Sequence, residues 1–258
     1  MDRPIISPGW RVRSVADAGP AQSPADLRYG TIPPADGPWL RPGLALVLDM
    51  DGVIIDSNPV HREAWALYNR RFGIETTEAM QQRMYGKHNE EIVRDFLGSH
   101  LTSEEVAAHG AAKERLYRQM VGESVDRFLV PGVRSFLQRH TGLPVAVATN
   151  AEPANVNFVL DTAGLRHCFR VVLDGHQVAR PKPAPDIYYR AAELLGMAPA
   201  NCIVFEDSYS GVEAALAAGM RTIGVLTTHT DLPGTSLCID TFENSNLEPW
   251  LRSQMPQS

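Results

Sequence analysis

Short apolar runs alternate along the chain with longer stretches in which apolar residues recur at helical spacing. The first run, Leu44–Leu48, contains no charged residue and predicts a strand that is buried on both faces. Four later runs predict further strands, at Val145–Ala148, Val171–Leu173, Cys202–Phe205 and Thr222–Val225. Because strands that alternate with helices form βαβ units, the predicted fold class is α/β with a parallel sheet.

A helical module interrupts this alternation after the first strand. Asn58-Pro59 predicts a helix start, a capping residue followed by proline in the first turn, and Gly73 predicts its end. More helix is expected between residues 76 and 122, with breaks at Gly86, Gly98 and Gly110. A module whose two linkers leave the sheet beside reactive residues is well placed to act as a lid. We therefore assign residues 59–127 to a cap domain and residues 44–58 and 128–258 to a core domain.

Residues 1–43 differ from the rest, because proline and glycine recur with few aliphatic residues between them. Such a composition offers too little burial to offset the entropy of ordering, which predicts a flexible or loosely docked extension. Trp10 and Trp39 are candidate anchors to the domain or to a partner subunit.

Composition and charge narrow the functional classes. The chain is 44% hydrophobic, enough for a full core, and its net charge of −6 with no basic block argues against nucleic-acid binding. No apolar run is long enough to cross a membrane, and no signal-peptide pattern begins the chain. Three widely spaced cysteines, Cys168, Cys202 and Cys238, suit the reduced thiols of a cytoplasmic protein. Oligomeric state stays open.

Candidate chemistry begins where the first strand ends. Asp49 and Asp51 are separated by one residue and followed by Gly52. Unpaired carboxylates are costly to bury, so the pair should lie at the carboxyl end of the strand, where open α/β sheets bind ligands. One carboxylate could attack an electrophile while the other manages a proton, with a divalent cation between them. A strand that merely stops at an acidic turn is the alternative.

Three later segments add further polar groups. Thr149-Asn150 follows the second predicted strand, where ordinary turn chemistry is the alternative. Lys182 stands among three prolines in Arg180-Pro-Lys-Pro-Ala-Pro-Asp186, which either hold its ammonium group in place or form a loop with a solvated lysine. Glu206-Asp207 ends another apolar strand and repeats the first pattern.

In this order the four segments resemble the motifs of the haloacid dehalogenase-like (HAD) superfamily. They read D-M-D-G-V-I-I-D, A-T-N, R-P-K-P-A-P-D-I-Y and F-E-D-S-Y-S-G-V-E-A-A, and the resemblance extends from Leu44 to Val225. It implies a Rossmann-like doubly wound parallel sheet with a small α-helical cap inserted after the first strand. Within the superfamily the chain is most similar to the β-phosphoglucomutase-like and sugar-phosphate phosphatase group, through D-G-V-I-I-D-S, His61 and Trp65.

The resemblance also implies roles for individual residues. Asp49 would be the nucleophile that forms an aspartyl-phosphate, and Asp51 would be the general acid and base. Mg²⁺ would be held by Asp49, the backbone carbonyl of Asp51 and Asp207, with Glu206 as a direct or indirect partner. Thr149, Asn150 and Lys182 would stabilise the oxygens of the transferring phosphoryl group. The second aspartate argues against a dehalogenase.

Residues of the cap region are candidates for contact with the substrate. Ser57 either touches the phosphate or caps the helix, and His61 either acts near the hinge or has a structural role. Lys87 lies in the segment that meets substrate in relatives, although a charged surface turn is the alternative.

The cap segment separates two enzymatic functions. β-Phosphoglucomutases carry lysine-glycine here and an arginine three residues after the glycine, whereas this chain has Tyr85-Gly86 and Asn89. These differences favour a phosphomonoesterase acting on a small phosphorylated metabolite, with a phosphosugar mutase or a non-catalytic binding domain as alternatives.

Overall fold

A computed structural model describes residues 43–84 and 89–255. The predicted N-terminal extension with Trp10 and Trp39, the predicted break at Gly86 and the candidate Lys87 therefore lie outside the described residues. Within the described part, no helix is both long enough and apolar enough to cross a membrane.

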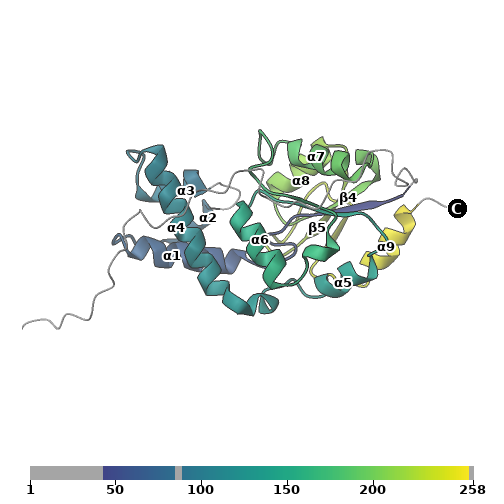
Figure 1. Cartoon of the computed structure of the whole chain (residues 1–258), viewed down its shortest axis with the longest axis horizontal. Helices are drawn as coiled ribbons and strands as arrows, with labels where there is room; N and C mark the ends of the chain where they lie inside the picture. The colour runs from purple at the N-terminus through teal and green to yellow at the C-terminus, as the bar shows by residue number, and fades with distance from the viewer. Residues whose placement is uncertain (1–42, 85–88, 256–258) are drawn as a thin grey trace, which may run out of the picture. The chain divides into compact units, whose positions relative to one another are not determined.

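The core is built around a parallel sheet (Figure 1). The described residues form six strands in the order β3-β2-β1-β4-β5-β6. The strands are β1 Ala45–Leu48, β2 Val145–Ala148, β3 Val171–Leu173, β4 Cys202–Glu206, β5 Arg221–Val225 and β6 Leu237–Ile239. This arrangement confirms the predicted α/β class, and all five predicted strands are present within one residue. The order reverses at β1, which lies between β2 and β4, and ligands bind outside the carboxyl ends of strands at such a switch point.

The sixth strand, β6, is absent from the sequence prediction. Within the described part of the chain it pairs only with β5, at the edge of the sheet, and Cys238 at its centre is exposed. A short edge strand is buried on fewer sides than a central one, so it needs no continuous apolar run.

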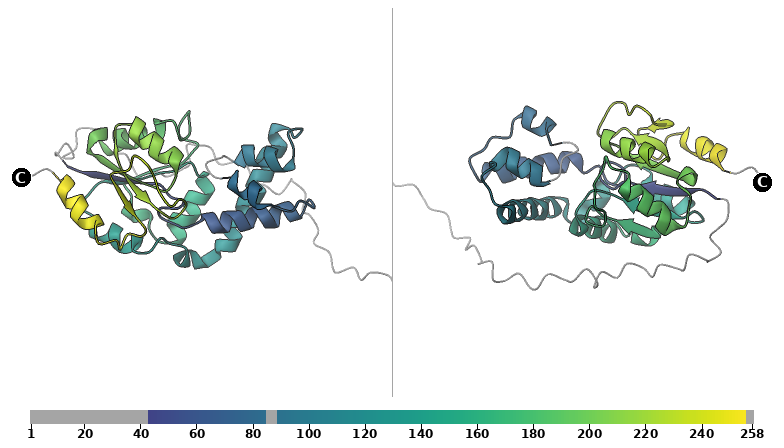
Figure 2. Two further views of the ribbon diagram at one scale, coloured as in Figure 1. Left: turned by 180° about the vertical axis from the view of Figure 1, so that it is seen from behind. Right: turned by 90° about the horizontal axis from the view of Figure 1, so that it is seen from above.

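Helices cover both faces of the sheet because successive side chains of a strand point to opposite sides. Leu46 and Leu48 of β1 pack in the cluster that includes α5, α6 and α9, whereas Ala45 and Val47 pack in the cluster formed with α7 and α8. Figures 1 and 2 show α7 and α8 on one side of the sheet and α5, α6 and α9 on the other. The bounds are α5 Val133–Arg139, α6 Pro153–Thr162, α7 Asp186–Leu195, α8 Tyr209–Ala217 and α9 Leu247–Gln254, with short 3₁₀ turns η4 Arg166–Cys168 and η5 Pro199–Asn201.

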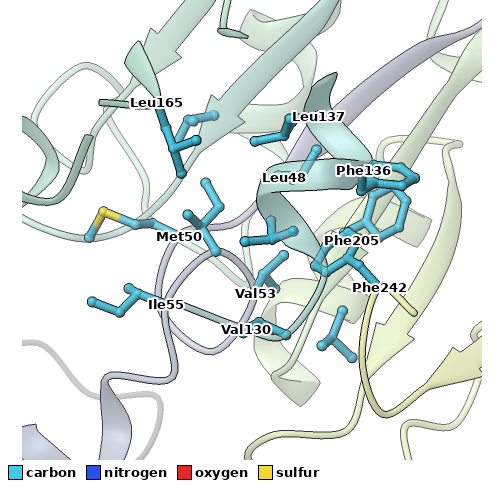
Figure 3. Packing of buried hydrophobic residues seen from close by; sticks show 14 of the residues in the cluster. Leu48, Met50, Val53, Ile55, Val130, Phe136, Leu137, Leu165, Phe205 and Phe242 are labelled. Carbon is cyan, nitrogen blue, oxygen red and sulfur yellow. The ribbon is translucent and has the colours of Figure 1, made fainter. Parts of the chain in front are cut away.

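Large side chains close to the end of β1 pack tightly on the first of these faces. Figure 3 shows Leu48 and Met50 in the same cluster as Phe136, Phe205 and Phe242. The ring centroids of Phe136 and Phe242 are 4.9 Å apart, and those of Phe205 and Phe242 are 5.4 Å apart. This packing fixes the backbone that leads directly into Asp49 and Asp51.

The helical insert lies in the chain between β1 and α5. It comprises α1 Asn58–Arg70, α2 Glu78–Gln82, α3 Asn89–Leu97, α4 Ser103–Val121 and the 3₁₀ turn η3 Gly122–Arg127. Trp65 and Phe96 meet edge to face, 5.6 Å apart, within a small apolar cluster of its own. The domain boundaries at residues 58/59 and 127/128 stay a prediction.

Two expectations for the insert are wrong. Gly110 does not break a helix but lies buried inside α4, where an added Cβ would lie 3.4 Å from Cβ of Asn89, an ordinary van der Waals contact. The first helix was expected to end at Gly73, but α1 ends at Arg70, and Phe72 beyond its end is 49% exposed. Gly98 does follow the end of α3 as predicted.

Candidate active site

Asp49 stands at the carboxyl end of β1, at the centre of the sheet. Its backbone N–H donates to the carbonyl of Phe205 on β4 over 3.0 Å, and its side chain is buried. Three residues later the chain turns through Gly52, whose φ is +78°. A side chain at Gly52 would also overlap the Asp207 carboxylate, with its Cβ 1.9 Å from Oδ2. Glycine is therefore needed there both for the turn and for the close approach of Asp207.

Lys182 joins the ends of three strands. Its Nζ donates to Asp49 Oδ1 and to Glu206 Oε1, each over 2.6 Å, and to the carbonyl of Ala148 over 2.9 Å. The Asn150 side chain accepts a hydrogen bond from the Lys182 backbone N–H at 3.2 Å, so it positions the loop that carries the lysine. Burial alone would lower the pKa of Lys182, but the charges of Asp49 and Glu206 outweigh it and raise that pKa.

Glu206 is held by donors on both of its oxygens. Oε1 accepts from Lys182 and from the Tyr188 hydroxyl, each at 2.6 Å. Oε2 accepts from the backbone N–H groups of Asp207 and Ser208 and from the Ser208 hydroxyl, at 3.1, 3.3 and 3.0 Å. Gly211 leaves room for this carboxylate, because a Cβ there would lie 1.9 Å from Oε1. Glu206 thus organises the end of β4 as well as facing the acidic cluster.

The acidic cluster fits a hard divalent cation. Asp49, Glu206 and Asp207 are buried, and each can offer one oxygen so that the three atoms lie within 4.8 Å of one another. Three carboxylates face the single ammonium group of Lys182, which leaves more negative than positive charge in a buried space. Mg²⁺ binds through oxygen ligands, usually carboxylates beside the phosphate of a substrate, so the residues present fit this ion.

Burial and the crowding of negative charge in the cluster raise the pKa values of two of its carboxylates. Burial raises the pKa of Asp49 to about 7, with further raising by Glu206 and Asp51, although Lys182 opposes the shift. Burial likewise raises the pKa of Asp207 well above its ordinary value, and the charges of Glu206 and Asp49 add to it. A cation would favour the ionised form of both carboxylates.

Asp51 lies at the border between the core and the insert. The Ser57 hydroxyl donates to Asp51 Oδ1 over 2.5 Å, and Nε2 of His61 is 3.7 Å from the same oxygen. Ser57 occupies the N-cap position of α1 but makes no capping hydrogen bond with its side chain. Of the two roles considered for Ser57, capping is therefore not observed. The side chain instead orients Asp51.

Thr149 and Asn150 lie at the end of β2, beside Asp49. Thr149 is buried and its hydroxyl accepts a hydrogen bond from the backbone N–H of Ala151 at 3.2 Å. Both residues line the same cleft as Asp49, Asp51, Lys182 and Asp207. That cleft has a volume of about 1030 Å³ and also takes walls from the insert, including His61, Trp65, Asn89 and Lys113.

Sequence reasoning missed a buried polar group on the insert wall of the cleft. Lys113 of α4 pairs with its neighbour Glu114 and is 3.2 Å from Nδ1 of His61. Glu114 also accepts from the amides of Asn89, at 2.6 Å, and of Asn155 on α6, at 2.7 Å. Burial opposes ionisation of Glu114, but Lys113, His61 and these donors prevail and lower its pKa to about 2.

Tyr117 supports the position of His61. The two rings stack with centroids 3.9 Å apart and planes inclined by 10°. Tyr117 and Lys113 lie on α4, so the insert presents His61 toward Asp51 from a packed surface. The signal available in the sequence was helical spacing alone, since Lys113 and Tyr117 are four residues apart and share a face.

The arrangement matches known proteins in sequence and structure. A family model described as haloacid dehalogenase-like hydrolase matches residues 44–219. Fructose-1-phosphate phosphatase YqaB of Escherichia coli strain K12 is 34% identical over 183 residues, which cover 70% of this chain and 95% of that protein. β-Phosphoglucomutase of Bacillus subtilis strain 168 is 27% identical over 186 residues, 70% of this chain and 82% of that protein.

Solved structures share the architecture. The crystal structure of a HAD hydrolase of family IA, variant 3, from Entamoeba histolytica superposes with a TM-score of 0.74 at 27% identity. The match covers 82% of this chain and 99% of that chain, so it includes the insert as well as the sheet.

Proposed function

The chain belongs to the haloacid dehalogenase-like hydrolases, and we propose that it is a Mg²⁺-dependent phosphomonoesterase that works through an aspartyl-phosphate on Asp49. Its substrate would be a small phosphorylated metabolite, with sugar phosphates first among the candidates. The observation that carries the proposal is the convergence of Lys182 and three buried carboxylates at the end of β1, two residues before an oriented second aspartate.

Asp49 would attack the phosphorus atom of the substrate. A bond forms between the carboxylate oxygen and phosphorus while the bond from phosphorus to the leaving oxygen breaks. Asp51 would donate its proton to that leaving oxygen, and would then remove a proton from the water that cleaves the aspartyl-phosphate. The hydrogen bond from Ser57 to Asp51 supports this role, because it would hold the Asp51 carboxyl group in one orientation during both transfers.

Cationic and neutral donors would bind the transferring group. Lys182 contacts Asp49, and Thr149 and Asn150 line the cleft beside it, which supports a role for all three in stabilising charge on the phosphoryl oxygens. Mg²⁺ would be held by Asp49, Asp207 and the backbone carbonyl of Asp51, with Glu206 as a supporting partner. When bound, the ion would neutralise charge on the phosphate and on the carboxylates.

A phosphatase is favoured over a phosphosugar mutase by charge on the insert. A mutase holds a bisphosphate, whose second phosphate calls for cations facing the core. Lys113 is paired with Glu114, and Asn89, where mutases carry arginine, donates to the same carboxylate.

Relatives named for fructose 1-phosphate and for hexitol phosphates support a sugar-phosphate substrate. Three free cysteines support a cytoplasmic location.

A substrate panel tests the proposal. Purified protein with Mg²⁺ would be offered phosphorylated sugars, sugar alcohols and other small phosphomonoesters, with β-glucose 1-phosphate included, and inorganic phosphate would be measured. A coupled assay for glucose 6-phosphate would run beside it, with the bisphosphate activator present. We expect phosphate release from several compounds and poor isomerisation. Efficient isomerisation without phosphate release would establish the mutase, and no turnover of any compound would favour a non-catalytic domain.

A further inference from the structure

The side chain of Asn58 leaves the helix that it begins. Asn58 was expected to cap α1, but it is the first residue of that helix and Ser57 takes the N-cap position. The Asn58 amide instead donates to Thr228 Oγ1 over 2.6 Å and to Asp207 Oδ2 over 3.3 Å. A side chain at the start of the insert therefore contacts a carboxylate of the acidic cluster.

Thr228 completes a chain of hydrogen bonds to the same oxygen. Its hydroxyl oxygen accepts a hydrogen bond from the Asn58 amide, and its hydroxyl proton is donated to Asp207 Oδ2. The ionised carboxylate can only accept, so the donor and acceptor roles in this chain of hydrogen bonds are fixed. The loop that carries Thr228 follows β5 and is held against the turn after β1, since the Thr227 hydroxyl donates to the carbonyl of Gly52 over 2.6 Å. Three segments that are far apart in the sequence thus meet at Asp207: the end of β4, the loop after β5 and the start of α1.

The hydrogen bonds restrict the Asp207 carboxylate in a specific way. Asp207 is 5% exposed and its Oδ2 also packs against Gly52, so the side chain has little room to rotate. With Oδ2 held by two donors, the second oxygen keeps one direction. Donors in series also strengthen one another, because each bond polarises the next.

We propose that Asn58 and Thr228 are positioning residues for Asp207, and that they set the affinity for Mg²⁺ and link its binding to the start of the insert. The inference rests on the proposed metal site. Partners that orient a ligating carboxylate usually contribute ten- to a hundredfold in metal affinity. Since Asn58 belongs to α1, whatever displaces the start of α1 alters the support of Asp207, and by reciprocity bound Mg²⁺ stabilises the start of α1.

Mg²⁺ binding without substrate tests the inference directly. Isothermal titration calorimetry with Mg²⁺ alone would compare the wild type with Thr228→Val, Asn58→Ala and the double variant. We expect Thr228→Val to raise the Kd by about tenfold or more and Asn58→Ala by a smaller factor. The double variant should lose less than the product of the two factors, because both residues act in one chain of hydrogen bonds. Thr228→Ser keeps the hydroxyl and should bind as the wild type does.

Two matched controls stand outside the chain of hydrogen bonds. Thr230→Val alters an exposed threonine of the same loop, and Asn246→Ala alters an asparagine at the start of α9 whose side chain makes no capping bond. Both should leave the Kd unchanged. Thermal unfolding without Mg²⁺ would verify that each variant folds, and the Asn58 and Thr228 variants test the inference independently of each other.

A second experiment tests whether Mg²⁺ binding is linked to the start of the insert. Hydrogen exchange should show that Mg²⁺ increases protection of the first turn of α1 in the wild type and not in Asn58→Ala. If the wild type binds Mg²⁺ and the folded variants bind it equally well, the inference is wrong while the proposed function stands. If the wild type binds no Mg²⁺, the metal site of the proposed function fails as well.

Discussion

The Ser57 hydroxyl donates to Asp51 Oδ1 over 2.5 Å, and this bond joins the residue before helix α1 to the candidate general acid. The next residue, Asn58, reaches Asp207 in the same region. Two consecutive side chains at the start of the insert therefore hold two different carboxylates of the site. The orientation of the acid and the support of the acidic cluster both depend on how this helix begins.

Removal of the Ser57 hydroxyl should slow catalysis without unfolding the protein. A hydrogen bond to a charged group is worth about 1.5–3 kcal/mol, and 1.4 kcal/mol corresponds to about tenfold in rate. We expect Ser57→Ala to lower kcat by about tenfold or more with a small change in KM, and Ser57→Thr to retain most activity. Steady-state phosphate release measures both. Equal kcat values for Ser57→Ala and the wild type would show that Asp51 is oriented by other groups.

Substitutions of Glu206 and of Asp207 should differ in their effects on thermal stability and on the Mg²⁺ dependence of activity. Among the described residues, four supply five donors to Glu206. Glu206→Ala would leave these buried donors without a partner and should lower the melting temperature even without metal. Activity should vanish in a chelator and return with Mg²⁺, and Asp207→Ala should weaken that return more than Glu206→Ala does. Thermal unfolding and Mg²⁺ titrations of activity separate the two effects. Full activity in excess EDTA would contradict the metal site.

The buried pair of Lys113 and Glu114 should make stability depend on pH. Glu114 has a pKa of about 2 in the folded protein against an ordinary value of 4.5, so its stabilisation is complete above pH 4.5 and is lost as the pH falls toward 2. This depression corresponds to about 3 kcal/mol. Glu114→Gln should therefore lower the free energy of unfolding at pH 7 by about that amount, because Lys113 would remain buried without its counter-charge.

The difference between Glu114→Gln and the wild type should narrow as the pH falls from 5 to 3. Urea unfolding at several pH values measures it, with Glu104→Gln on the exposed side of the same helix as the control. A difference that stays constant over this range would mean that the charge of Glu114 contributes nothing to stability.

Much of the core follows from local sequence patterns. The central strands β1 and β4 are buried throughout, so their side chains had to form continuous apolar runs. Their carboxyl ends lie at one edge of a parallel sheet, which is why Asp49, Glu206 and Asp207 come together as the pattern indicated. Lys182 was identified because three prolines surround it in the sequence. The loop that they form carries the Lys182 ammonium group into contact with Asp49 and Glu206.

The polar residues that the sequence analysis did not identify are brought together by packing between separate helices and strands. Glu114 is a charged residue on a helix, and the sequence does not reveal that Asn89 and Asn155 approach it from two other helices. Thr228 could have been found, because it follows β5, the neighbour of β4, and polar residues after adjacent strands lie at the same edge. Asn58 was interpreted as a cap because that is the usual role of asparagine before proline at a helix start.

In the proposed mechanism Asp49 carries the phosphoryl group during turnover. Borohydride reduces an acyl phosphate to an alcohol, so quenching the enzyme with borohydride during turnover of its best substrate should convert Asp49 to homoserine, which peptide mass spectrometry detects. We expect that product with substrate present, and neither the product nor activity in Asp49→Asn, whose amide cannot attack phosphorus. An unmodified Asp49 in the wild type, together with more than about a tenth of wild-type activity in Asp49→Asn, would contradict the account.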